Sequence, residues 1–337
     1  MPAPGKSASG FELRLVCVVL LCFAVGSASG QDAAAPNSSA TQSRIYSIPL
    51  ELIHDKPYVS VLVNGHGPHR FLIDTGTGTD ALVTPALAEE LHLPVVGRAH
   101  LTDPSGLGQQ RSEIARIDSL NLGGAEFSDV DAVVHKLYGD TNCEGVLGFT
   151  LFEDYLLTLD FPAHRMTLAT GVINADAGED AGGSVLPFRM PEGVPIVALK
   201  IDEQQFEAQI DSGGTGLSVP EKDSRELRFG EAPVEFGSAE SVSTRFQIKG
   251  ARLRSDVRLG RYTFSQPFIE INSAFPLVNI GSTPLQHFII TFDQLNELVR
   301  LYASQDTLHL DASPTIMELL NAPKREAPDR TLVPVGQ

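Results

Sequence analysis

Two short motifs in this chain each end an apolar run with an aspartate, a hydroxyl-bearing residue and a glycine. The first, FLIDTGTGTD, carries Asp74, and the second, AQIDSGGTG, carries Asp211. Two carboxylates that share one site cannot both ionise easily, so one stays protonated while the other is charged. Such a pair can take a proton from water and donate one to a carbonyl oxygen. The repeated motif therefore predicts one site built from two halves.

Other site chemistries find little support in the sequence. It contains no His-Glu-x-x-His, no Gly-x-Ser-x-Gly and no Gly-Lys phosphate loop, so we expect no metal and no cofactor. His66 and His69 fall in the turn VNGHGPH and are expected to be solvated loop residues. The stretch at 76–81 also fits a dinucleotide-binding fingerprint, but Pro85 would fall inside the helix that this fingerprint requires.

The elements that must position the two aspartates are β-rich. The runs YVSVLVNG and HRFLID precede Asp74, and PIVALKID and QFEAQID precede Asp211. Their alternation and their β-branched content favour strands over helices. Each motif is followed by a short apolar run and a proline. We therefore expect each aspartate at the end of a strand, in a tight turn.

The similarity between the two halves continues downstream. The segments GVLGFTLFEDYLLTLDF and VNIGSTPLQHFIITFDQ align through Gly148 and Gly281, which follow their aspartates by 74 and 70 residues. The alignment also pairs Tyr155 with Phe288, Thr158 with Thr291 and Asp160 with Asp293. This internal duplication predicts a β-rich lobe of roughly 120 to 130 residues, an ordinary domain size, that occurs twice.

These motifs resemble the active-site turns of aspartic proteases. Asp74-Thr75-Gly76-Thr77 resembles one turn, and Asp211-Ser212-Gly213 resembles its partner in the other lobe. Val146-Leu147-Gly148 and Asn279-Ile280-Gly281 resemble the apolar-apolar-Gly segments that pass beside those turns. The resemblance covers 45–302 and is closest to exported bacterial retropepsin-like proteases with two lobes fused as in pepsin. It implies an all-β fold: two similar pepsin/retropepsin-like β-barrel lobes with an active-site cleft between them.

The same resemblance implies an aspartic-type endopeptidase, a hydrolase that performs proteolysis with water activated between Asp74 and Asp211. By analogy, Thr75 and Ser212 each hydrogen-bond across to the opposite turn. Glycines allow a tight turn close to a carboxylate. The expected site therefore consists of catalytic Asp74 and Asp211, supported by Thr75, Gly76, Thr77, Ser212 and Gly213.

The two turns differ at one position. Thr77 can offer a hydroxyl to Asp74, whereas Gly214 at the matching position has none for Asp211. Hydrogen bonds to the charged form of a carboxyl favour that form. The hypothesis from sequence is that Asp74 is the more readily ionised of the two.

A mobile hairpin, or flap, is expected over Leu101–Ser112, with Ser105, Gly106 and Gly108 as its candidate residues. Unlike the flap of pepsin-like enzymes, it contains no aromatic residue. An extended peptide or protein substrate would pair its backbone with this hairpin. A monomer is sufficient for this function because one chain holds both halves of the site. The alternatives are a non-catalytic bilobal scaffold or peptide-binding protein, and a homodimer in which each lobe pairs with its twin.

The ends and the charge of the chain bear on its location. The net charge of −17 over 337 residues argues against nucleic acid as a partner. A basic start and the short apolar run Leu15–Val25 predict an export signal, hence a periplasmic or secreted protein without a stable membrane span, with an uncleaved anchor as the alternative. The expected organisation is a signal peptide at 1–30, a flexible leader at 31–44, lobes at 45–170 and 185–302 joined by a linker at 171–184, and a tail at 303–337.

Overall fold

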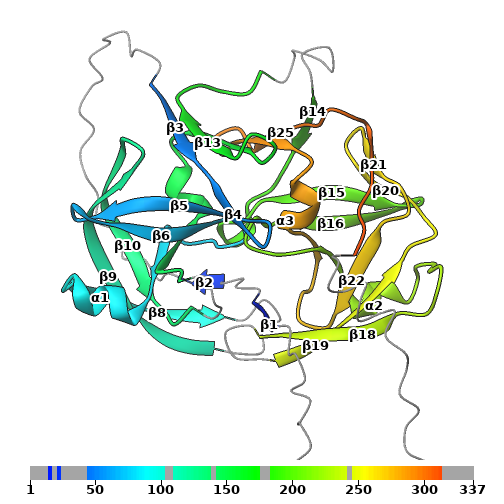
Figure 1. The fold of residues 1–337 in the computed structure, drawn as a ribbon, viewed down its shortest axis with the longest axis horizontal. Helices are drawn as coiled ribbons and strands as arrows, with labels where there is room; N and C mark the ends of the chain where they lie inside the picture. Colours follow the sequence, from blue (N-terminus) through cyan, green and yellow to red (C-terminus); the bar gives the residue numbers. More distant parts are fainter. Residues whose placement is uncertain are drawn as a thin grey trace, which may run out of the picture.

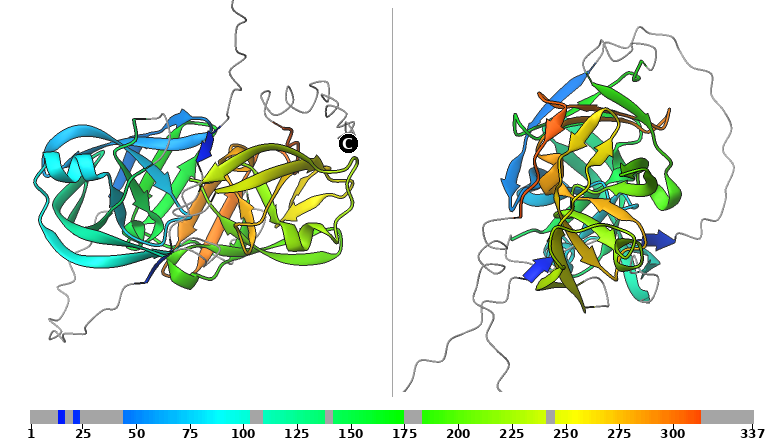
Figure 2. Two further views of the ribbon diagram at one scale, coloured as in Figure 1. Left: turned by 90° about the horizontal axis from the view of Figure 1, so that it is seen from below. Right: turned by 90° about the vertical axis from the view of Figure 1, so that its right-hand side faces the viewer.

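The computed structural model describes residues 14–16, 21–23, 44–102, 109–137, 142–174, 183–240 and 245–312. Strands dominate this part of the chain, and the helices in it are one or two turns long. Three sheets form two lobes that lie side by side (Figures 1 and 2). The expected all-β fold of two barrel-like lobes is confirmed. No helix in the described residues has the length and apolar character needed to cross a membrane.

The N-terminal lobe is built on a sheet of nine strands, in the order β2-β8-β9-β10-β7-β11-β6-β5-β4. An additional pairing of β9 with β5 closes the sheet into a barrel. The elements of this lobe are β2 (Leu21–Phe23), β4 (Glu51–Ile53), β5 (Lys56–Val63), β6 (His66–Asp74), β7 (Ala81–Val83), α1 (Pro85–Glu90), β8 (Val95–Thr102), β9 (Gln109–Leu122), β10 (Ala125–Val134), β11 (Gly145–Gly148) and the 3-10 turn η1 (Phe149–Phe152).

The C-terminal lobe is built on a sheet of eleven strands, in the order β1-β18-β19-β22-β17-β23-β16-β15-β20-β21-β26. Its elements are β1 (Arg14–Val16), the 3-10 turn η4 (Pro191–Gly193), β15 (Ile196–Ile201), β16 (Gln204–Ile210), β17 (Leu217–Pro220), α2 (Glu221–Ser224), β18 (Val234–Glu240), β19 (Arg245–Arg252), β20 (Val257–Leu259), β21 (Tyr262–Phe264), β22 (Phe268–Asn272), β23 (Val278–Ile280), α3 (Ser282–Leu285) and β26 (Thr307–Leu308).

A six-stranded sheet joins the lobes, across the top of Figure 1. Its two central strands, β12 and β24, are antiparallel and place Thr158 directly opposite Thr291, with their hydroxyl oxygens 2.9 Å apart. The sequence alignment equates these two threonines, so a local two-fold axis passes between them. The strands, in sheet order, are β14 (Ser184–Pro187), β25 (Leu298–Tyr302), β24 (Ile289–Asp293), β12 (Leu156–Asp160), β13 (Arg165–Ala169) and β3 (Ile45–Pro49).

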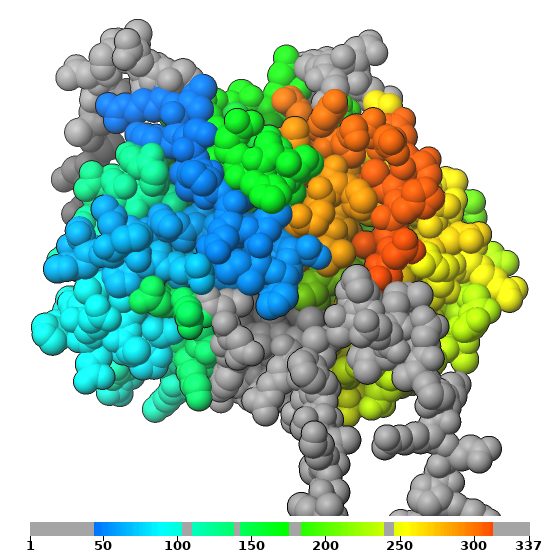
Figure 3. Space-filling view, viewed as in Figure 1, coloured from blue at the N-terminus to red at the C-terminus, as the bar shows by residue number. Residues whose placement is uncertain are grey.

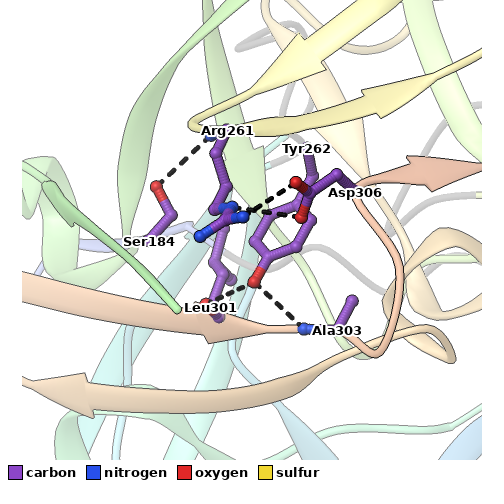
Figure 4. Close-up of polar contacts among 6 residues, drawn as sticks. All are labelled: Ser184, Arg261, Tyr262, Leu301, Ala303 and Asp306. Atoms are coloured by element: carbon purple, nitrogen blue, oxygen red, sulfur yellow. Dashed lines mark hydrogen bonds and ion pairs between the residues drawn. The ribbon is translucent and has the colours of Figure 1, made fainter. Parts of the chain in front are cut away.

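Packing and polar contacts fix the lobes to this joining sheet. One apolar core runs through both lobes, and within it the rings of Phe149 and Phe292 lie 5.0 Å apart, edge to face. In the C-terminal lobe the buried Tyr262 hydroxyl donates to the carbonyl of Leu301, which ties β21 to β25 (Figure 4). The lobes also touch directly, because Thr283 of α3 donates to the carboxylate of Asp55. In the space-filling view of Figure 3, the blue surface of the N-terminal lobe meets the orange surface of the C-terminal half of the chain.

One expectation for a histidine is wrong. His66 is exposed, but His69 is buried, and its Nδ1 lies 3.0 Å from Oε1 of Glu144. The turn is shorter than the motif VNGHGPH indicates, because β6 already begins at His66 and alternation then places His69 on an inward face. The expected signal peptide, leader and tail fall largely outside the described residues, apart from β1, β2, Arg44 and the chain from 303 to 312.

Candidate active site

Strand order places the two aspartates at matching points of the two lobes. Asp74 is the last residue of β6, and Asp211 directly follows β16. In the N-terminal lobe, β11 runs parallel to β6 and antiparallel to β7, and in the C-terminal lobe β23 runs in the same way between β16 and β17. In each lobe the downstream strand, β11 or β23, therefore passes through the loop that begins at the aspartate.

This threading explains the glycine that ends the N-terminal segment. Gly148 pairs with Asp74, and its amide donates to the carbonyl of Asp80 at 2.9 Å. A Cβ at this position would lie 1.8 Å from the carbonyl oxygen of Thr79. Only glycine leaves enough room for the two backbones, so the duplicated glycine has a steric cause.

The two carboxyl groups meet in the interior. Asp74 and Asp211 are both fully buried, and they share a side-chain hydrogen bond. The glycine of each turn packs on the opposite carboxyl group: a Cβ on Gly213 would lie 2.3 Å from Cγ of Asp74, and one on Gly76 would lie 2.6 Å from Cγ of Asp211. Both glycines are thus needed for the approach of the two carboxyl groups.

Four crossed hydrogen bonds lock the two turns together. The Thr75 hydroxyl donates to the carbonyl of Ile210 at 2.8 Å and accepts from the amide of Ser212 at 3.0 Å. The Ser212 hydroxyl donates to the carbonyl of Ile73 at 2.7 Å and accepts from the amide of Thr75 at 3.0 Å. Each hydroxyl therefore satisfies two buried backbone groups of the other half, which is the bonding that the family resemblance implied.

Each carboxylate also receives one backbone donor and one side-chain donor. Asp74 accepts from the Gly76 amide at 2.8 Å and from the Thr77 hydroxyl at 2.9 Å. Asp211 accepts from the Gly214 amide at 2.7 Å and from the Asn279 side-chain amide at 2.7 Å. The two carboxylates therefore accept the same number of these hydrogen bonds.

This symmetry removes the reason for assigning the charge to Asp74. Burial, and then the neighbouring charge of Asp211, raises the pKa of Asp74 well above its ordinary range. The hydrogen bonds from Thr77 and Gly76 act in the opposite direction and are outweighed. The hypothesis that Asp74 ionises more readily is therefore not supported, and the pair is better described as two carboxyl groups that share one proton.

Asn279 makes a side-chain contact to a candidate catalytic carboxylate that the sequence comparison missed. It lies 68 positions from Asp211 in the chain and reaches it because β23 pairs with β16. A signal was present: asparagine stands where the N-terminal segment has Val146, in an otherwise apolar pattern. A polar residue on a buried strand indicates a buried hydrogen-bond partner.

The candidate flap residues Ser105, Gly106 and Gly108 lie outside the described residues. The strands on either side of them, β8 and β9, pair from Thr102 opposite Gln109 onwards. The C-terminal lobe has a corresponding hairpin, formed by β18 and β19. The short strands β1 and β2 lie along the outer edges of β18 and β8 respectively, so both hairpins accept an added strand (Figure 1).

Residues 59–151 match the family model described as aspartyl protease. The N-terminal lobe is an aspartyl protease domain. The matched stretch of this domain contains the Asp74 turn, the β8–β9 hairpin and the threading segment at Gly148. A search of curated proteins found no match for the chain. Within the described residues, no cluster of His, Cys, Asp and Glu has the grouping of a metal site.

Proposed function

We propose that the protein is an aspartic-type endopeptidase that hydrolyses peptide bonds with water activated between Asp74 and Asp211. One observation carries this proposal: two buried carboxyl groups, one from each lobe, are held in contact by the crossed hydrogen bonds of Thr75 and Ser212. The membership of the N-terminal lobe in the aspartyl protease family supports it.

The chemistry follows from one proton shared by two carboxyl groups. The ionised carboxylate takes a proton from a water molecule as its oxygen attacks the peptide carbonyl carbon, and the protonated carboxyl donates to the carbonyl oxygen. The tetrahedral intermediate then collapses, the C–N bond breaks and the leaving amine takes up a proton. The backbone and side-chain donors around each carboxylate hold its oxygens in place during these transfers.

An extended peptide or protein segment is the substrate that suits the edges of the two hairpins. The strands β1 and β2 already add to β18 in parallel and to β8 in antiparallel orientation. A substrate could add to the same edges through main-chain hydrogen bonds, which give affinity without demanding one sequence. Both β1 and β2 lie in the expected signal peptide, so export and cleavage would leave these edges to the substrate.

The proposal includes a monomeric, exported protein. One chain supplies both carboxyl groups and both locking hydroxyls, so a second copy is not needed for the site. The predicted signal peptide at 1–30 favours a periplasmic or secreted location, which a fractionation of expressing cells would test.

The test is an assay of the chain from Gln31 onwards on a peptide library from about pH 3 to pH 7, the range in which a carboxyl pair titrates. We expect cleavage by the wild type and loss of cleavage in Asp74→Asn and Asp211→Asn. Asp118→Asn, which removes an exposed carboxylate on β9, is the control that should remain active. Cleavage that survives both dyad substitutions would rule out the mechanism, and peptide binding without cleavage at any pH would favour a scaffold.

A further inference from the structure

The two lobes carry equivalent rows of side chains on the face that bears the catalytic carboxyl group. In the N-terminal lobe the row crosses four strands: Leu72 pairs with Val146, Val146 with Leu82, and Leu82 with Val133. Leu72 lies two residues before Asp74 on β6, so the two side chains share a face. All four are buried and pack against Leu101 of the β8–β9 hairpin in one apolar cluster.

The C-terminal lobe repeats this pairing with polar residues. Gln209 pairs with Asn279, Asn279 with Ser218, and Ser218 with Glu270. Gln209 again lies two residues before the catalytic Asp211. The duplication therefore placed four polar side chains where the other lobe has a packed apolar row.

The polar row of the C-terminal lobe borders a pocket. Ser218, Glu270 and Asn279 of this row, together with β19, line a cavity of about 10 Å³, which is the room of one water-sized group. One wall is apolar, made by Phe246, Ile248 and Phe275, and the rest is mostly polar. The full lining is Thr215, Gly216, Ser218, Phe246, Ile248, Glu270, Asn272, Phe275 and Asn279.

Two acceptors that line this pocket have no hydrogen-bond donor among the described residues. The Asn279 amide nitrogen is used by Asp211, but its Oδ1 is buried without a hydrogen-bond partner. Glu270 is 8% exposed, and among the described residues no hydrogen bond to its carboxylate is found. Lys56 acts on Glu270 through its charge, and a carboxylate can accept about four hydrogen bonds. Buried acceptors of this kind require donors, which a ligand can supply.

A glycine makes room for the glutamate. A Cβ on Gly216 would lie 2.5 Å from Oε1 of Glu270, so any larger residue would displace the carboxylate. Gly216 lies in the loop that Asp211 begins, and Asn279 touches Asp211 itself. The pocket is therefore adjacent to the reacting carboxyl group, where a side chain next to the scissile bond would lie.

We propose that this pocket is a subsite for a lysine side chain of the peptide substrate, with the ammonium group on Glu270 and on Oδ1 of Asn279. The inference rests on the proposed peptidase function and deepens it. The cavity has room for the ammonium group alone, so the methylene stem would lie at its opening, against apolar surface, as lysine stems do. An ammonium group is compact, whereas the planar guanidinium of arginine needs more room than the cavity has.

The test compares, at about pH 7, where Glu270 ionises, peptides that differ only by lysine or norleucine at one of the two residues that flank the cleaved bond. Norleucine keeps the stem and lacks the ammonium group. We expect wild-type kcat/KM for the lysine peptide to exceed that for the norleucine peptide by about tenfold or more, a ratio that one charge-assisted hydrogen bond can supply. Glu270→Val, which introduces the residue found at the equivalent Val133, should reverse the preference.

Glu270→Gln keeps the shape of the pocket and serves if the valine variant does not fold. Glu235→Gln, at an exposed position of β18, is the matched control and should keep the wild-type ratio. Equal kcat/KM for both peptides in the wild type would overturn the subsite and leave the endopeptidase proposal intact. If the wild type cleaves neither peptide, the endopeptidase proposal fails, and binding to the Asp74→Asn chain decides the subsite: equal binding, or none, overturns it.

Discussion

The burial of Glu270 predicts a pH dependence of the protein's stability that can be measured without a substrate. Burial raises its pKa from the ordinary value of 4.5 to about 7, and the charge of Lys56 only partly opposes this shift. A pKa that is higher in the folded than in the unfolded state means that folding favours the protonated form. The stability that comes with protonation is complete below about pH 4.5 and is lost as the pH rises through about 7.

The size of the loss follows from the shift. A difference of 2.5 between 4.5 and about 7, at 1.36 kcal/mol for each pKa unit, corresponds to about 3 kcal/mol. Glu270→Gln has no proton to lose in this range. We expect the variant to unfold with a free energy close to that of the wild type at acid pH and up to about 3 kcal/mol higher at alkaline pH.

The measurement is the free energy of unfolding in urea at a series of pH values between about 4 and 8, for the wild type and Glu270→Gln. The raised pKa of Asp74 adds its own pH dependence to both proteins and cancels in their difference. Glu126→Gln, at an exposed position of β10, is the control and should follow the wild type. If the wild-type and Glu270→Gln curves stay parallel over this range, Glu270 does not titrate as its burial requires.

Four further substitutions test the site. Gly148→Ala would place a Cβ 1.8 Å from the carbonyl oxygen of Thr79, so we expect loss of more than about 4 kcal/mol or no folded protein, seen by circular dichroism. Ser212→Ala leaves two buried backbone groups without their partner and should reduce the free energy of unfolding by about 1–3 kcal/mol, measured in urea; an unchanged midpoint would contradict the locking role. Thr77→Val and Asn279→Leu each remove one side-chain donor from a carboxylate and should each move the acidic limb of the pH–rate profile to higher pH, whereas a shift in only one of them would show that the two carboxyl groups are not equally served.

Much of the fold could be predicted from the sequence because the two halves of the chain repeat the same pattern of strands and turns. Short stretches of sequence are enough to predict the strands before Asp74 and Asp211, because apolar and polar residues alternate in them. The downstream glycines are also visible in short stretches, because a larger side chain would collide with the backbone there. The alignment of the two halves already equated Thr158 with Thr291, and the joining sheet places these two residues directly opposite each other. The crossed bonds of Thr75 and Ser212 entered only through the family resemblance, because no local pattern shows which turn a hydroxyl will meet.

The residue types and their repetition were thus determined by the sequence alone: two aspartates, each in a glycine-containing turn after a strand. Only the tertiary structure decided how these carboxyl groups differ in their surroundings. Strand pairing brings Asn279 to Asp211 and sets Glu270 beside Ser218, contacts between residues more than fifty positions apart. Hydrogen bonding and desolvation depend on such neighbours in space, so the sharing of the proton and the polar pocket in one lobe became visible only when the strands were in register.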